Sequence, residues 1–148
     1  MKKIMTIALL MLLSVGANAQ KEVFQKYKGM EGVTTLHVPK FLMRLAGRAS
    51  KEAQTLTDRV SHIRVLSCEE ESLAKKIKAD ALAAYKRGGS EEMMRINEDG
   101  QRVVIYQRIL KSGKNEYAIL AVDDELAIVN VVGRLSLEEL DQVNDMID

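Results

Sequence analysis

The side chains of this sequence that could carry out acid–base, nucleophilic or metal chemistry do not form a catalytic motif. The candidates are two histidines, the only cysteine and four aspartates: His37, His62, Cys68, Asp58, Asp99, Asp123 and Asp124. A hydrolase needs a nucleophile, a base and an orienting group brought together, and the spacing of these residues supports no such triad. The sequence therefore predicts no catalytic residue and no cofactor, and it favours a protein that is not an enzyme.

The two histidines fall in separate segments that we expect to be strands, 33–38 and 61–68. If these strands pair, His37 and His62 become neighbours. Two imidazoles are fewer than the three protein ligands of a catalytic zinc site, so no metal site is predicted. Ordinary strand positions with solvated or hydrogen-bonded rings are favoured over a functional pair.

Two further motifs resemble ligand sites only superficially. Asp123-Asp124-Glu125 lacks the alternating ligands and central glycine of a calcium-binding loop, so it indicates a solvated turn. Gly88-Gly89-Ser90 lacks the Gly-Lys-Ser/Thr ending of a phosphate loop, so it indicates a helix stop. Cys68, as the only cysteine, cannot form an intrachain disulfide, and its place after an apolar run predicts a small buried side chain.

The first 19 residues have the pattern of a secretory signal peptide. Lys2 and Lys3 precede an apolar run from Ile4 to Val15, and Ala17-Asn18-Ala19 is a small-residue cleavage site. The run is too short for a transmembrane helix, although a retained interfacial anchor is an alternative. We therefore predict a periplasmic or secreted protein that begins at Gln20 and has no membrane span.

Residues 20–148 have the length of a single domain, and their charge is nearly balanced. Loss of Lys2 and Lys3 leaves 20 of the 22 basic residues against 21 acidic ones, which changes the formal net charge from +1 to −1. This balance argues against a nucleic-acid partner. One domain over 20–148 is predicted.

The local patterns predict helices that alternate with strands in the first part of the chain and several consecutive strands after it. We predict a helix over 21–27, a strand over 33–38, a helix after Pro39, a polar connection over 47–58 and a strand over 61–68. A helix follows, with Ser67 and Glu70 as a capping box, a stripe of Leu73, Ile77, Ala81 and Ala84, and an end at Gly88-Gly89. Ser136 and Glu139 form a second capping box that begins a closing helix.

Residues 93–133 contain four short apolar runs separated by three polar turns, which predicts an antiparallel meander. The turns are Glu98-Asp99-Gly100-Gln101, the segment 111–115 and Asp123-Asp124-Glu125. Together with the helices, the meander predicts an α+β fold, a largely antiparallel sheet with helices packed on it.

Both faces of the meander are apolar, which is unusual for an antiparallel sheet with one wet face. Val103 and Ile105 point to one side, and Val104 and Tyr106 point to the other with Arg108 and Leu110. Either the helices of the chain cover both faces, or one face is an interface. We place the possible interface at Val104, Tyr106, Arg108 and Leu110.

Several segments resemble an uncharacterised family of exported bacterial proteins, the domain of unknown function family 4252. They are His62 to Leu66 with the following helix, Glu91-Glu92-Met93-Met94, Asn97-Glu98-Asp99-Gly100, Val103-Val104-Ile105-Tyr106, and Ile128-Val129-Asn130-Val131-Val132-Gly133 before Leu135. The resemblance implies export and supplies no catalytic or binding residues.

The leading hypothesis is an exported, non-enzymatic module of the cell envelope that binds another protein or itself. The alternative is a small-ligand carrier or divergent envelope hydrolase with a pocket between the sheet and segment 39–60. A concave site with converging histidine or acidic side chains favours the enzyme, and an apolar surface without them favours the binding module.

Overall fold

The computed structural model describes residues 19–38, 48 and 51–139. It contains these elements: α2 (Ala19–Tyr27), β1 (Val33–Val38), α4 (Lys51–Arg59), β2 (Val60–Cys68), α5 (Glu71–Arg87), β3 (Glu91–Glu98), β4 (Gln101–Ile109), β5 (Asn115–Val122) and β6 (Leu126–Gly133). Most of the predicted signal peptide, the helix expected after Pro39 and the end of the closing helix lie outside the described residues.

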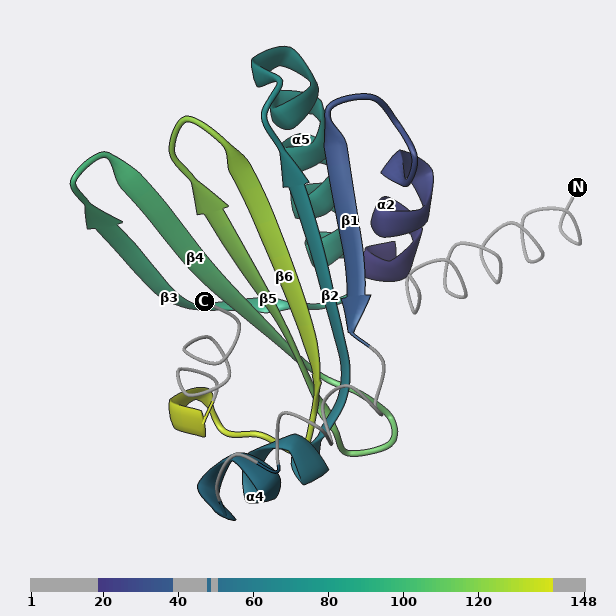
Figure 1. Ribbon diagram of the computed structural model, residues 1–148, viewed down its shortest axis with the longest axis vertical. Helices are drawn as coiled ribbons and strands as arrows, with labels where there is room; N and C mark the ends of the chain where they lie inside the picture. Colours follow the sequence, from purple (N-terminus) through teal and green to yellow (C-terminus); the bar gives the residue numbers. More distant parts are fainter. Residues whose placement is uncertain (1–18, 39–47, 49–50, 140–148) are drawn as a thin grey trace, which may run out of the picture.

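The strands form one six-stranded sheet in the order β1-β2-β6-β5-β4-β3, and every neighbouring pair is antiparallel (Figure 1). Strands β3 to β6 make the predicted meander, and β2 joins it beside β6. The predicted α+β class is therefore confirmed. The order leaves β1 and β3 as the two edge strands of the sheet.

The β3–β4 turn forms where the sequence predicts it, because its two central residues tolerate a positive φ. Asp99 has φ 49° and Gly100 has φ 81°. Two successive residues in this region give the turn a twist that matches the two strands it joins. The register then runs from Glu98 opposite Gln101 to Glu91 opposite Gln107, with a bulge between Glu92 and Met94.

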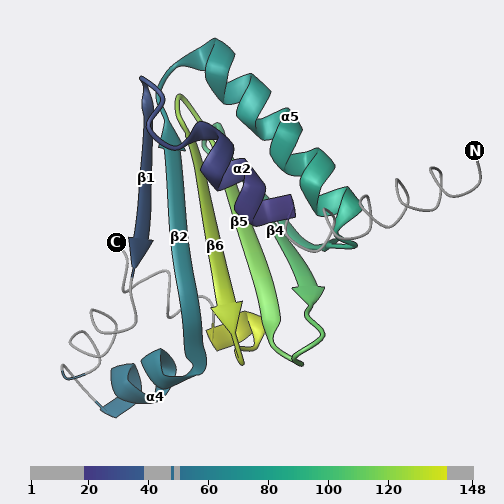
Figure 2. The same ribbon diagram turned by 90° about the vertical axis from the view of Figure 1, so that its right-hand side faces the viewer.

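Helices α5 and α2 cover one face of the sheet, which we call the helix face (Figure 2). Alternation along each strand turns half of its side chains to this side. The predicted stripe of α5 supplies Ile77, Ala81 and Ala84 to the core, and α2 adds Phe24 and Tyr27. They pack on sheet residues that include Leu66, Leu120 and Ile128.

The opposite side of the sheet, which we call the open face, holds a second apolar cluster. Its buried members are Val60, Ile63, Ile105, Tyr117, Ile119, Val131 and Leu135. Leu137 packs against this cluster from the helical turn that follows β6 and a short connection. The hydroxyl of Tyr117 donates to the carbonyl oxygen of Leu135 at 2.7 Å, which fastens that connection to the sheet.

The two predicted capping boxes have different outcomes. Glu139 donates its backbone N–H to Oγ of Ser136 at 3.3 Å, and the N–H of Ser136 reaches Oε1 of Glu139 at 3.3 Å, so the second box is confirmed. The first is wrong. Ser67 is paired within β2, and Glu70 is the N-cap of α5 without a side-chain capping bond.

The polar connection predicted over 47–58 is also partly wrong, because Lys51–Arg59 form α4. This helix lies at one end of the sheet and leads directly into β2 (Figure 1). The N–H of Arg134 donates to the carbonyl oxygen of Arg59 at 3.0 Å, which joins the end of α4 to the residue after β6. A contact so distant in sequence is not visible in a local pattern.

Candidate functional site

The residues predicted as a possible interface lie mainly on the helix face. Val104 is 8% exposed, and the ring of Tyr106 lies 4.8 Å from that of Tyr85 on α5. Leu110 follows the end of β4 and is half-buried. Helix α5 of this chain therefore covers Tyr106, and Val104 is buried within the same chain, which is the intramolecular alternative for this register.

The fourth predicted interface residue, Arg108, belongs to a buried ion pair. Its Nη2 lies 2.9 Å from Oε1 of Glu116 on the adjacent strand, and the two side chains are 13% and 10% exposed. Its Nη1 donates to the carbonyl oxygen of Gly88 at the end of α5, at 3.4 Å. Arg108 therefore links β4, β5 and the end of α5.

Burial raises the pKa of Glu116, while the charge of Arg108 and hydrogen bonds from Arg108 and Asn130 lower it in part. Asn130 is 1% exposed. A carboxylate enclosed in this way and neutralised by its neighbour has no route to a substrate. We assign the pair a structural role.

The two histidines become neighbours, as predicted for paired strands. Strands β1 and β2 pair, and the rings of His37 and His62 have centroids 6.0 Å apart. Burial, followed by the charges of Arg64 and His37, lowers the pKa of His62. Within the described ranges, no group of three or more His, Cys, Asp or Glu side chains is placed to hold a metal ion.

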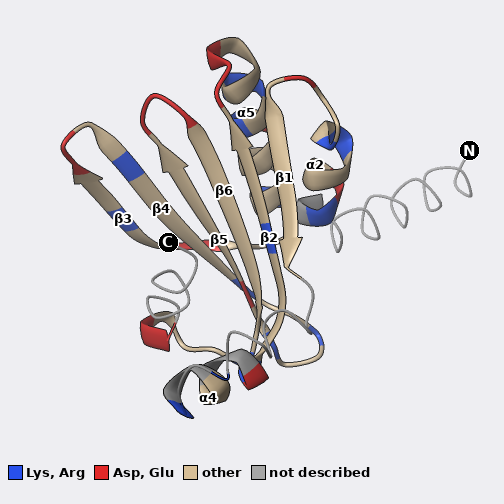
Figure 3. Cartoon of the chain, in the orientation of Figure 1, with Lys and Arg blue, Asp and Glu red and all other residues tan. Residues whose placement is uncertain are grey.

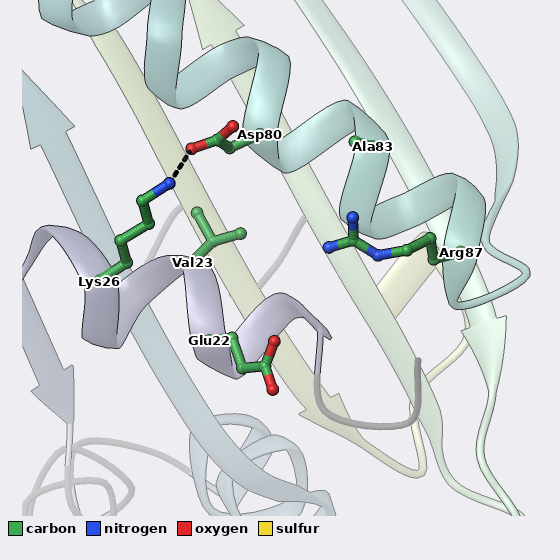
Figure 4. Close-up of a pocket in the computed structure, with 6 residues that line it drawn as sticks. All are labelled: Glu22, Val23, Lys26, Asp80, Ala83 and Arg87. Carbon is green, nitrogen blue, oxygen red and sulfur yellow. Dashed lines mark hydrogen bonds and ion pairs between the residues drawn. The ribbon is translucent and has the colours of Figure 1, made fainter. Parts of the chain in front are cut away.

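A shallow groove of about 240 Å³ lies between α2 and α5 (Figure 4). Lys26 Nζ lies 2.9 Å from Oδ2 of Asp80, which also accepts a hydrogen bond from the hydroxyl of Tyr27. These bonds, from Tyr27 first and then Lys26, lower the pKa of Asp80. Asp80 is thus already occupied by partners from α2, and the other charged side chains that line the groove are Glu22 and Arg87.

The pocket expected between the sheet and segment 39–60 involves a segment of which half lies outside the described ranges. Of that segment, the structure describes Arg48 and residues 51–60. No observation on these residues favours a ligand carrier or a hydrolase. Both remain sequence hypotheses.

The open face carries a continuous apolar row that crosses all six strands. The paired registers align Leu36, Val65, Val129, Ile119, Ile105 and Met94 in that order. The middle of the row is buried, with Ile119 at 8% and Ile105 at 6% exposure. Its two ends are not: Leu36 on β1 is 56% exposed and Met94 on β3 is 39% exposed.

The β3 end of this row is the largest local group of exposed apolar side chains in the described part of the chain. Met93, Met94 and Ile96 are 46%, 39% and 41% exposed, and we call them the β3 patch. They are three of the seven large hydrophobic residues found exposed in the described ranges. Methionine is common on adaptable binding surfaces because its side chain is flexible and polarisable.

Charged residues surround the β3 patch and give it an acidic rim. Glu91, Glu92, Glu98 and Asp99 outnumber Arg95 and Arg102, and Arg95 Nη2 is already 2.5 Å from Glu92 Oε1. The end of the β3–β4 hairpin also forms a polar hollow of about 380 Å³ that includes Glu98, Asp99 and Arg102. Local sequence patterns did not point to this patch, although Met93-Met94 lies close to a predicted turn.

Residues 27–143 match the family described as Domain of unknown function (DUF4252). The chain belongs to the DUF4252 family. The match covers β1 to β6 and confirms the resemblance seen in the meander and its flanks. No curated protein and no solved structure is significantly similar to this DUF4252 chain. Within its described residues, no helix has the length and apolar character needed to cross a membrane.

Proposed function

We propose that this protein is an exported, non-enzymatic interaction module of the bacterial cell envelope that binds another protein through the β3 patch. The observation that carries the proposal is the group of exposed Met93, Met94 and Ile96 on one edge strand. Apolar side chains clustered on a surface and rimmed by polar residues are typical of protein interfaces.

The charges around the patch define the chemistry of the partner. The acidic rim of Glu91, Glu98 and Asp99 favours a partner whose apolar contact surface is bordered by lysine or arginine. We therefore expect a basic, partly apolar partner, and salt should slow its association because rim charges act mainly on the association rate.

Export is supported by the N-terminal pattern of residues 1–19 and is tested separately. N-terminal sequencing of the protein from the periplasmic or secreted fraction should begin at Gln20 or its cyclised form. Recovery of intact Met1 from that fraction would contradict cleavage.

The binding proposal is tested with matched lysine substitutions on the two sides of the molecule. Met94→Lys places a cation in the β3 patch, where it removes apolar contact and repels a basic partner. Leu82→Lys is the control, because Leu82 on α5 is similarly exposed, at 36%, and lies on a different element.

Tagged wild-type and variant proteins are incubated with envelope extract, and bound proteins are cross-linked and identified by mass spectrometry. We expect at least one cross-linked partner to be lost with Met94→Lys and retained with Leu82→Lys. That partner should cross-link through a basic segment. Equal retention by both variants, or equal loss, would exclude the β3 patch as the binding surface.

A further inference from the structure

The two edges of the sheet differ in their protection against pairing with another strand. In β3, four of eight residues are charged, and the register has a bulge between Glu92 and Met94. Charges and bulges are the usual features that prevent edge-to-edge association. Strand β1 has neither: its sequence VTTLHV contains no lysine, arginine, aspartate or glutamate, and it pairs with β2 in six consecutive registers without a shift. Figure 3 shows the same contrast, with β1 uncoloured by charge.

The outer edge of β1 is also unpaired by any strand that the structure describes, since β1 ends the sheet order. Three of its residues, Thr34, Leu36 and His37, are exposed. Leu36 is 56% exposed although it ends the apolar row of the open face. An uncharged edge strand that is rich in β-branched residues and carries an exposed leucine is poorly suited to contact with water.

We propose that β1 pairs with β1 of a second copy of this chain, antiparallel about a two-fold axis at Leu36. In this register Leu36 lies opposite its own counterpart, Thr35 opposite His37, and Thr34 opposite Val38. Residues opposite each other in an antiparallel pair share a face, so the apolar row continues from one copy into the other across twelve strands.

The uncharged sequence of β1 makes this strand compatible with itself, so a second copy fits this edge without like-charge repulsion. Two β1 strands meet without like charges, whereas two β3 strands would bring six glutamates together. The alternative centre, at Thr35, would place the apolar Leu36 opposite Thr34 and is less favourable for that reason. The pairing does not depend on the β3 patch, which lies on the other edge of the sheet.

The first test is the solution mass of the mature chain, measured by light scattering as a function of concentration. The wild type should be a dimer. Leu36→Lys should weaken dimerisation by at least about tenfold, because two lysines then lie opposite each other at the axis. Ile96→Lys is the matched control: it changes an exposed apolar residue of the same face on the other edge strand, 41% exposed, and should leave the dimer intact.

The second test fixes the register and does not rely on affinity. Under oxidising conditions Leu36→Cys should form a disulfide-linked dimer, because opposite residues of an antiparallel pair have Cα atoms about 4.5–5.5 Å apart. Met94→Cys is the control and should stay unlinked, and native Cys68 is 1% exposed and does not interfere.

A monomeric wild type would overturn the proposal. A dimer broken by Ile96→Lys and not by Leu36→Lys, or linked by Met94→Cys and not by Leu36→Cys, would overturn it as well. Loss of partner cross-linking in Met94→Lys while the dimer persists would separate the binding proposal from this one.

Discussion

The buried pair of Arg108 and Glu116 gives the most quantitative prediction. The Glu116 side chain is 10% exposed in the wild type, and Arg108→Ala removes the cation that pairs with its carboxylate. Breaking a buried ion pair in this way costs about 3–5 kcal/mol, since the remaining charge is desolvated and uncompensated. Against a typical total of about 5–15 kcal/mol, the variant should lose roughly a fifth or more of its free energy of unfolding.

Urea unfolding followed by circular dichroism measures this loss. For a small domain, 3–5 kcal/mol corresponds to a decrease in the unfolding midpoint of roughly 1–5 M urea. Lys75→Ala is the control, because its ion pair with Glu71 spans 3.5 Å between side chains that are 78% and 86% exposed. Removing such a surface pair should change the free energy of unfolding by less than about 1 kcal/mol.

The pH dependence supplies an independent check. Burial already raises the pKa of Glu116 in the wild type, and loss of Arg108 should raise that pKa further. A carboxyl group whose folded pKa lies above its unfolded value binds protons preferentially in the folded state. The difference in stability between wild type and Arg108→Ala should therefore be largest at neutral pH and shrink as the pH falls toward the unfolded pKa. A loss below about 1 kcal/mol at pH 7 would refute the assignment of this pair as buried and structural.

Four further outcomes follow from single side chains. Tyr85→Phe should leave the free energy of unfolding unchanged or slightly higher, because the buried Tyr85 hydroxyl has no hydrogen-bond partner among the described residues. Tyr117→Phe should lower the free energy of unfolding by about 1–2 kcal/mol, because it removes the hydrogen bond to the carbonyl oxygen of Leu135. Urea unfolding compares the two variants, and a larger loss in Tyr85→Phe would contradict this. Tyr106→Asp should unfold the domain, since it places a charge beneath α5, and a folded circular dichroism spectrum would show that α5 does not cover it. His62 has a lowered pKa, so its unfolded form binds protons more strongly and stability should fall as the pH drops through about 6.5. His62→Gln should reduce the pH dependence of the free energy of unfolding, and an unchanged dependence would show that other groups cause it. Cys68 is buried at 1% exposure, so Cys68→Ser should cost on the order of 1–3 kcal/mol and wild-type thiol labelling should require unfolding; rapid labelling of the folded protein would be the contrary result.

Local features of the sequence were sufficient for much of the secondary structure. The strand predicted over 33–38 is β1 with the same bounds, because four of its residues are β-branched and a glycine precedes it. Asp99-Gly100 determines the β3–β4 turn, since its φ values favour those two residue types. The Ser136 capping box is likewise local, because its two partners are three residues apart.

Local patterns failed where a distant contact decided the structure. The polar segment before β2 forms α4, whose end is joined through Arg59 to Arg134 after β6. Ser67 does not cap α5, because pairing of β2 with both β1 and β6 continues through Cys68. In each case a tertiary contact or a strand pairing outweighed a weak local preference.

The location of the candidate site was decided entirely at the tertiary level. Alternation in β4 shows that Val103 and Val104 point to opposite sides, but both sides are apolar, so the sequence alone does not tell which one α5 covers. It equally does not show that β1 and β3 are edges, because strand order depends on pairings such as β2 with β6, some sixty residues apart. The alternation of side chains between the two faces of a strand is a local property of the backbone. The exposure of Met94 and Leu36 depends instead on which strands of the sheet have no neighbour.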